Sequence, residues 1–162
     1  MIFWKMGWKD DEKFGTRLAN LLKNIDKEIQ VGRKVNLIGI SAGGSMALNV
    51  FAERQNTVNK VINVCGRLRS GIQVRPSLER ASREIISFRD SVLKFEQSKL
   101  RIDKNKRVKI ITIKGLYDEI VPVSTVILES TSNRRLICIG HSLTIFIALT
   151  FYLKNIFLMF DL

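Results

Sequence analysis

The sequence VNLIGISAGGS, residues 35–45, carries the strongest structural signal in this chain. Its first six residues form a short apolar run that is rich in β-branched side chains, which predicts a strand buried on both faces. The GxSxG pentapeptide of residues 39–43 follows, and a helix is predicted over about residues 42–53. A serine in a tight turn between a buried strand and a helix is the setting of a nucleophile elbow.

The chemistry of this turn depends on Ser41 and the two glycines around it. Gly39 and Gly43 leave room for neighbouring backbone, so the turn is tight and lifts the Ser41 hydroxyl above the sheet. The helix amino terminus behind Ser41 favours a developing negative charge. By itself the pentapeptide is also compatible with a phosphate-binding turn or a purely structural turn, so the rest of the chain must discriminate.

Strands and helices are predicted to alternate along the chain. This alternation implies βαβ units with right-handed crossovers. We therefore expect one α/β domain over residues 1–162, a three-layer α-β-α sandwich around a mostly parallel, doubly wound sheet of about five strands. The expected strands are residues 2–5, 35–40, 58–65, 108–113 and 135–139, and the expected helices are residues 14–29, 42–53, 77–100 and 142–158.

Two polar residues follow predicted strands at the points where those strands end. Asp118 lies in the loop after strand 108–113, and His141 comes directly after strand 135–139. Ligands bind outside the carboxyl ends of the strands in an open α/β sheet, so Ser41, Asp118 and His141 are expected at one edge. Three alternatives remain open: Glu119 is the acid, Asp118 is only a turn residue, or His141 is only a helix cap.

The formal net charge is +12, and most of the excess lies in one segment. Residues 66–109 hold 13 Lys or Arg and 5 Asp or Glu, which leaves +8 there. A solvated basic face on an inserted helix explains the pattern; the alternative is a patch from Arg67 to Lys109 that contacts an anionic surface or an acidic partner. Neither zinc-finger spacing nor an RNP-type aromatic motif is present, so no nucleic-acid partner is expected.

Cysteine and histidine are scarce in this sequence. Cys65 and Cys138 lack disulfide-scaffold or metal-ligand spacing, and His141 is the single histidine, so we expect no metal, no cofactor and a reduced, cytoplasmic compartment. The amino terminus lacks the features of a secretory signal. Residues 143–153 are apolar or hydroxylic, but a membrane span needs about 20 residues. A buried closing helix is expected there, with contact to a membrane surface or apolar partner as the alternative.

Together these segments resemble the α/β-hydrolase superfamily, in particular its esterase-like and lipase-like serine hydrolases. The resemblance rests on residues 35–45, on the loop GLYDEIVP (115–122), on GHS (140–142) and on the order Ser, Asp, His along the chain. It runs from about residue 34 to the end of the chain, and it implies acyl transfer from a small-molecule substrate to water.

The resemblance also implies a role for each residue of the set. Ser41 would attack an ester, thioester or amide carbonyl, His141 would carry the proton, and Asp118 would orient the imidazole. The backbone N–H of Ala42 would be one oxyanion donor. The helix over residues 77–100 stands where this family carries its lid, and it is either a lid-like cover or an ordinary packing helix.

The resemblance is incomplete at the amino terminus. This family takes a second oxyanion donor from a His-Gly or Gly-rich loop after an earlier strand, and residues 2–5 align best with the strand after that loop. The early strands and the loop are therefore expected to be missing. Three explanations compete: the chain is a fragment, it is an inactive relative that acts as a binding domain, or backbone near Gly7 and Trp8 supplies the donor.

Overall fold

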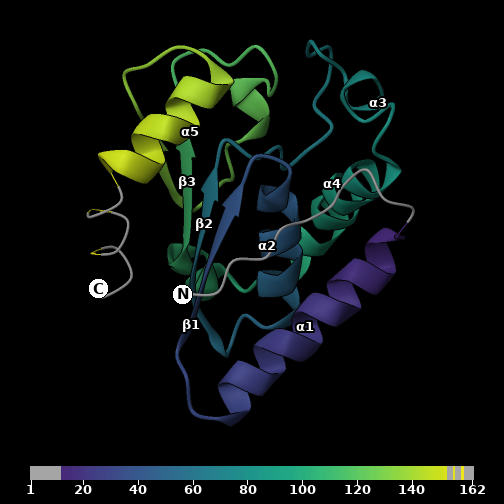
Figure 1. Cartoon of the computed structure of the whole chain (residues 1–162), viewed down its shortest axis with the longest axis vertical. Coiled ribbons are helices and arrows are strands. Elements are labelled where there is room, and N and C mark those ends of the chain that lie inside the picture. The colour runs from purple at the N-terminus through teal and green to yellow at the C-terminus, as the bar shows by residue number, and fades with distance from the viewer. Residues whose placement is uncertain (1–11, 153–154, 156–157, 159–162) are drawn as a thin grey trace.

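Four parallel strands form the centre of the molecule in the computed structural model, which describes residues 12–152, 155 and 158 (Figure 1). The strand order follows the chain, β1-β2-β3-β4. The expectation of a parallel sheet is confirmed; the fifth expected strand, residues 2–5, lies outside the described residues. The strands are β1 (Val35–Ile40), β2 (Val58–Val64), β3 (Ile110–Lys114) and β4 (Ser132–Arg135).

Helices cover both faces of this sheet, which gives the expected three layers (Figure 1). Three helices share one apolar core with β1 and β2: α1 (Phe14–Gln30), α2 (Gly43–Glu53) and α4 (Ile86–Ser98). A second core lies between the opposite face and α5 (His141–Thr150), where Ala148 is fully buried. The two cores follow from the alternation along β2, where Val61 faces the first core and Ile62 and Val64 face the second.

The register brings the carboxyl ends of the strands to one edge. Ile40 is paired with Val64, and Val64 is paired with Ile113. The segments that follow β1, β2 and β3 therefore begin side by side. The expected burial of β1 on both faces is wrong, because most of its residues are only half-buried. In the described part of the sheet β1 lies at an edge, where only one neighbouring strand flanks it.

Two strand boundaries differ from expectation. Strand β3 begins at Ile110, because Val108 and Lys109 belong to a 3₁₀ helix, Lys104–Lys109. Strand β4 precedes the apolar run in which the last strand was expected, and from that run Ile139 forms an isolated bridge with Tyr117. An exposed edge strand needs no apolar face, so the polar sequence SNRR of β4 carried no strand signal.

The expected helix over residues 77–100 is also wrong, because it is interrupted. A short helix, α3 (Leu78–Ala81), is followed by a turn, then by α4 and by a 3₁₀ helix, Lys99–Arg101. The Ser82 hydroxyl donates to the Leu78 carbonyl at 2.7 Å, and the Ile85 N–H donates to the Ser82 carbonyl. The Ser82 N–H donates to the same carbonyl at 2.9 Å, so the hydroxyl bond is added to this helical bond and does not replace it. A hydroxyl bond of this kind bends a helix, and the adjacent β-branched isoleucines that follow have a low helix propensity.

Part of the basic segment is built into the framework, although most of its Lys and Arg side chains are exposed. Arg67 is 1% exposed and donates to the carbonyls of Arg69, Ser70 and Pro76. Its burial lowers the pKa of the guanidinium. The Lys109 ammonium donates to the carbonyl of Val58 at 3.0 Å. Arg67, the first residue of the alternative patch from Arg67 to Lys109, is therefore not available for surface contact, because its charge is enclosed by backbone oxygens. Contact of the other basic residues with an anionic surface or an acidic partner stays a prediction.

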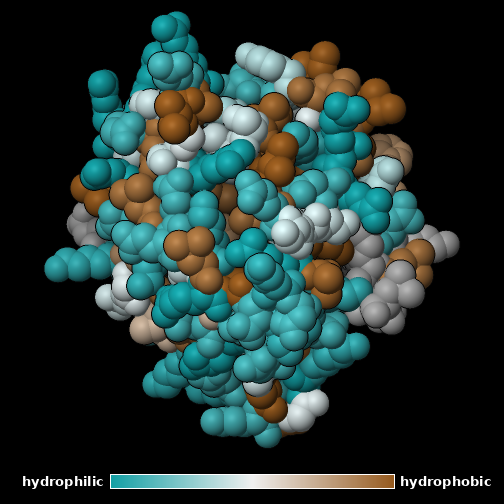
Figure 2. Space-filling view, turned by 180° about the vertical axis from the view of Figure 1, so that it is seen from behind, coloured by the Kyte–Doolittle hydropathy of each residue, from teal (hydrophilic) through white to brown (hydrophobic). Residues whose placement is uncertain are grey.

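The last helix and the outer surface bear on the remaining expectations. Helix α5 begins at His141 and ends at Thr150, and residues 153–154, 156–157 and 159–162 lie outside the described part. Among the helices that the structure describes, none combines the length and the apolar composition needed to cross a membrane. From behind, the surface is mainly hydrophilic, with apolar side chains scattered in smaller groups (Figure 2).

Candidate active site

Ser41 lies in the turn between β1 and α2 with a backbone that serine rarely adopts. Its φ is +51°, in the left-handed region, which costs about 1–3 kcal/mol for such a residue. Two backbone bonds hold the turn: the Ser41 N–H donates to the Val64 carbonyl at 2.9 Å, and the Gly44 N–H donates to the Ser41 carbonyl at 3.0 Å. The strain is therefore maintained by β2 on one side and by α2 on the other.

Glycine is required around this turn, but not at both expected positions. A Cβ on Gly39 would lie 2.5 Å from the Gly43 carbonyl oxygen and 2.7 Å from the Gly44 Cα. A Cβ on Gly43 would meet no heavy atom within 4 Å, so the expected space requirement there is wrong. The close approach occurs at Gly44, where a Cβ would collide with the Asn63 Oδ1 and lie 2.9 Å from the Gly66 Cα.

Asn63 supports the elbow from the neighbouring strand, and the sequence analysis did not identify it. This fully buried side chain donates to the Gly66 carbonyl at 2.9 Å and accepts from the Gly66 N–H at 3.1 Å. A Cβ on Gly66 would lie 2.6 Å from the Ser41 carbonyl oxygen. The turn after β2 is thus packed directly against the turn that holds Ser41. An asparagine inside an apolar strand was the available signal.

His141 brings an imidazole to the Ser41 hydroxyl from the opposite layer. Its Nε2 lies 2.8 Å from the Ser41 Oγ, and its Nδ1 lies 2.6 Å from the Asp118 Oδ2. His141 is 5% exposed and Asp118 is 6% exposed. With the proton on Nδ1, the imidazole donates to Asp118 and accepts from Ser41. The structure thus brings Ser41, His141 and Asp118 into one hydrogen-bonded chain at the expected edge.

The loop after β3 fixes the Asp118 carboxylate. Its second oxygen, Oδ1, accepts from the N–H groups of Ile120 at 2.9 Å and Val121 at 2.7 Å. The neighbouring Glu119 does not contact the imidazole; its carboxylate accepts instead from the backbone N–H of His141. A hydroxyl next to an imidazole that is oriented by a buried carboxylate is an arrangement that can activate an oxygen nucleophile.

A second nucleophilic side chain near the site is kept inactive by burial. Burial, with a smaller contribution from Asp118, raises the pKa of the Cys65 thiol to about 12. Because the thiolate is the reactive form, this thiol remains protonated and unreactive near neutral pH. Cys138 is also buried, and its thiol donates to the Thr144 hydroxyl. Ser41 is therefore favoured over either thiol as the nucleophile.

Backbone donors for an oxyanion are found at the start of α2. Ala42 is the N-cap residue of α2, and the first N–H groups of a helix have no partner within the helix. The second donor considered near Gly7 and Trp8 lies outside the described residues. Within the described residues, no three His, Cys, Asp or Glu side chains gather as metal ligands would.

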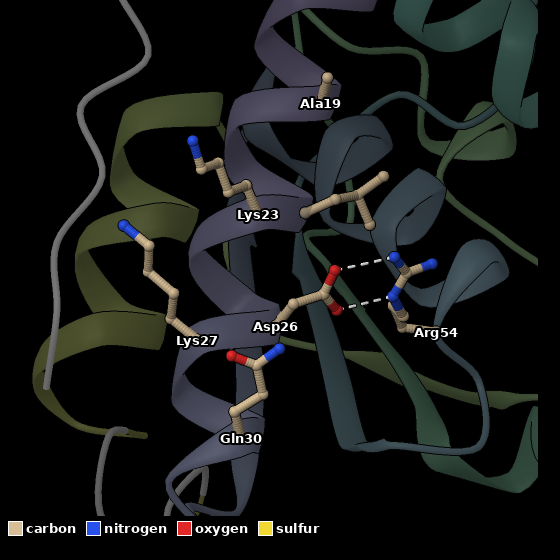
Figure 3. Close-up of a pocket in the computed structure, with 7 residues that line it drawn as sticks. Ala19, Lys23, Asp26, Lys27, Gln30 and Arg54 are labelled. Atoms are coloured by element: carbon tan, nitrogen blue, oxygen red, sulfur yellow. Dashed lines mark hydrogen bonds and ion pairs between the residues drawn. The ribbon is translucent and has the colours of Figure 1, made fainter.

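A surface hollow lies elsewhere, between α1 and the end of α2 (Figure 3). There Asp26 and Arg54 form a bidentate ion pair, with oxygen-to-nitrogen distances of 2.8 and 2.9 Å. The side chains of Lys23 and Lys27 extend away from this pair (Figure 3). The hollow contains none of the residues of the Ser41 site, and its charges at the ion pair already satisfy each other.

Comparison with known proteins identifies the fold. No protein-family model and no curated protein matches the sequence. Solved structures do match. A monoacylglycerol lipase from Paleococcus ferrophilus aligns with 89% of this chain and 75% of its own, at a TM-score of 0.55 and 14% identity. A metagenome-derived structure described with the lipolytic enzymes LipS and LipT aligns with 93% of this chain and 75% of its own, at a TM-score of 0.61 and 8% identity.

A third structure gives the same result. An alpha/beta superfamily hydrolase from Oenococcus oeni PSU-1 aligns with 93% of this chain and 75% of its own, at a TM-score of 0.56 and 14% identity. Identities this low show a shared fold and leave the reaction open. The chain therefore has the α/β-hydrolase fold.

Proposed function

We propose that this chain of α/β-hydrolase fold is a serine hydrolase that cleaves carboxylic esters, thioesters or amides through an acyl-enzyme. The observation that carries the proposal is the chain of two short hydrogen bonds, 2.8 Å from Ser41 to His141 and 2.6 Å from His141 to Asp118. The three residues come from three different turns, and the alternative of a purely structural serine turn does not account for the imidazole at the hydroxyl.

Acylation begins with attack of the Ser41 Oγ on the substrate carbonyl carbon. His141 Nε2 takes the hydroxyl proton, while Asp118 orients the ring and stabilises its charged form. The carbonyl oxygen becomes an oxyanion, to which the backbone N–H of Ala42, the residue after the nucleophile, would donate. The tetrahedral intermediate collapses, the bond to the leaving group breaks, and the leaving group receives the proton from His141.

Deacylation uses the same groups with water as the nucleophile. His141 takes a proton from water as the water oxygen attacks the acyl carbon. Collapse of the second intermediate breaks the bond to Ser41, returns the proton to its Oγ and releases a carboxylic acid. The net reaction consumes one water for each ester and requires no metal or redox partner.

Apolar side chains beside Ser41 favour an apolar acyl group. Leu78, Phe88 and Val92 form a buried cluster on α3 and α4, and Ala42 packs against it. This part of the expected lid-like segment, residues 77–100, borders the nucleophile. The rest of α4 packs on α2, where the Ser91 and Ser45 hydroxyls lie 2.8 Å apart. The contact of this cluster with Ala42 supports the proposal that the segment forms one wall of an acyl site, and the lipolytic enzymes among the similar solved structures are consistent with such substrates.

The test is labelling of the purified protein with a fluorophosphonate, which reacts with activated serines. We expect labelling of the unaltered protein, none of Ser41→Ala, and full labelling of Ser124→Ala, which removes an exposed hydroxyl six positions after Asp118. Circular dichroism of each protein verifies the fold. Absence of labelling in the folded, unaltered protein would refute the proposal and favour a non-catalytic binding domain.

A further inference from the structure

Glu119 makes a contact that the proposed reaction does not yet use. Its carboxylate accepts a hydrogen bond from the backbone N–H of His141, at 3.0 Å from Oε2 and 3.3 Å from Oε1. The two residues are 22 positions apart, so this bond joins the loop after β3 to the start of α5. It is also distinct from the bond between Asp118 and the imidazole, because it holds the main chain of His141.

His141 needs such a partner because of its place in the fold. It is the first residue of α5, so its N–H has no acceptor within the helix. The preceding residue, Gly140, has φ +101° and no side chain with which to cap the helix. A carboxylate at this terminus satisfies the N–H and interacts favourably with the helix dipole. Glu119 therefore supplies, from the loop after β3, the side-chain acceptor that Gly140 cannot provide at the start of α5.

The contact completes a clamp on the segment that carries the imidazole. The Gly140 N–H donates to the Tyr117 carbonyl at 2.9 Å, Asp118 meets the ring, and Glu119 meets the next backbone N–H. Three consecutive residues of one loop thus bind two consecutive residues of the other. Without Glu119, the backbone N–H of His141 loses its acceptor, and only the bonds of the ring to Asp118 and Ser41 and the bond of Gly140 to Tyr117 hold this segment in place.

We propose that Glu119 is a positioning residue, which holds the backbone of the general base at the distance from Ser41 that proton transfer requires. The inference rests on the proposed function. Reacting groups must lie within about 3–3.5 Å, and a displacement of about 1 Å can reduce the rate about 100-fold. Glu119 therefore acts through His141 and touches neither the substrate nor the Ser41 oxygen.

The kinetic test measures hydrolysis of p-nitrophenyl butyrate by three variants. Glu119→Ala removes the acceptor, and we expect kcat to fall about 10- to 100-fold with KM changed less than about twofold. Glu119→Gln keeps an amide oxygen as acceptor, and it should restore kcat to within about fivefold of the unaltered protein. Glu129→Ala removes an exposed carboxylate from the loop before β4 as a charge control and should leave both constants unchanged.

The second arm does not depend on activity. His141 is the only histidine, so its ring Nδ1–H signal in a ¹H–¹⁵N spectrum needs no assignment. We expect exchange of this proton with water to be at least about tenfold faster in Glu119→Ala and nearly unchanged in Glu119→Gln. Equal exchange in Glu119→Ala and the unaltered protein would overturn the inference, as would a kcat within about twofold. A lack of p-nitrophenyl butyrate hydrolysis in all proteins would count against ester cleavage within the proposed function and not against Glu119, because the exchange measurement still decides the role of Glu119.

Discussion

The packing at Gly44 leads to a sharp prediction about the stability of the elbow. In Gly44→Ala the new methyl group would collide with the Asn63 Oδ1 and lie 2.9 Å from the Gly66 Cα. The Gly66 Cα is part of the backbone and cannot move aside easily, and overpacking typically lowers the free energy of unfolding by about 1–3 kcal/mol. Displacing Asn63 also breaks its two bonds to Gly66, and a buried group left without a partner costs about 1–3 kcal/mol.

A gain in helix propensity opposes these losses. Alanine is favoured over glycine within a helix by about 1 kcal/mol. We therefore expect Gly44→Ala to lower the free energy of unfolding by about 1–5 kcal/mol, and Tm by roughly 2–20 °C for a chain of this size. Gly43→Ala is the matched control, because its methyl group meets nothing within 4 Å, and it should leave stability unchanged or raise it by up to about 1 kcal/mol.

The assay is urea unfolding followed by circular dichroism for the two variants and the unaltered protein. The midpoints should separate while the slope with urea stays constant, since the folded surface hardly changes. Fluorophosphonate labelling of folded Gly44→Ala should also be slower, because the Ser41 turn rests on this contact. Equal midpoints for Gly44→Ala and Gly43→Ala would refute the steric argument.

Two further predictions concern titratable groups. Hydrogen bonds from Arg54 hold the pKa of Asp26 below its usual range in the folded protein. The stabilisation by the Asp26 carboxylate is therefore present above the pKa of the unfolded chain, about 3.9, and it disappears as pH falls through the lower pKa of the folded state. Urea midpoints of Asp26→Asn and the unaltered protein should therefore differ at about pH 7 and converge below about pH 4; a constant gap would contradict this. Burial raises the pKa of the Cys65 thiol to about 12, and the Cys138 side chain is buried as well. Iodoacetamide at about pH 8 should therefore alkylate neither cysteine in the folded protein and both in urea. Rapid alkylation of the folded protein, measured by mass, would contradict the burial of these side chains.

The topology of the site was predictable because it depends on a regular rule. Strands that run parallel end at one edge, so residues directly after β1, β3 and the apolar run before α5 had to meet there. Ser41, Asp118 and His141 satisfy this rule from their positions in the chain alone. The rule needs only the existence and order of strands, so it tolerated the misplaced bounds of β3 and β4.

The supporting packing was not predictable in the same way. Gly43 and Gly44 are neighbours in one helix, and no periodicity distinguishes the glycine that faces β2 from the one that faces open space. The role of Asn63 was not predictable either, because its partner Gly66 belongs to a turn whose position depends on the register of β2. The apolar steps continue unbroken through Ser82, so the periodicity did not indicate the interruption between α3 and α4.

The distinction between Asp118 and Glu119 follows from the lengths of their side chains. The short Asp118 side chain turns back on its own loop, where the N–H groups of Ile120 and Val121 fix one oxygen and leave the other for the imidazole. Glu119 has one more methylene and follows one residue later, so its carboxylate reaches the backbone of α5 instead. Two adjacent acids thus hold the ring and the main chain of His141. The sequence placed both at the site, but only the conformation of the loop assigns each acid its partner.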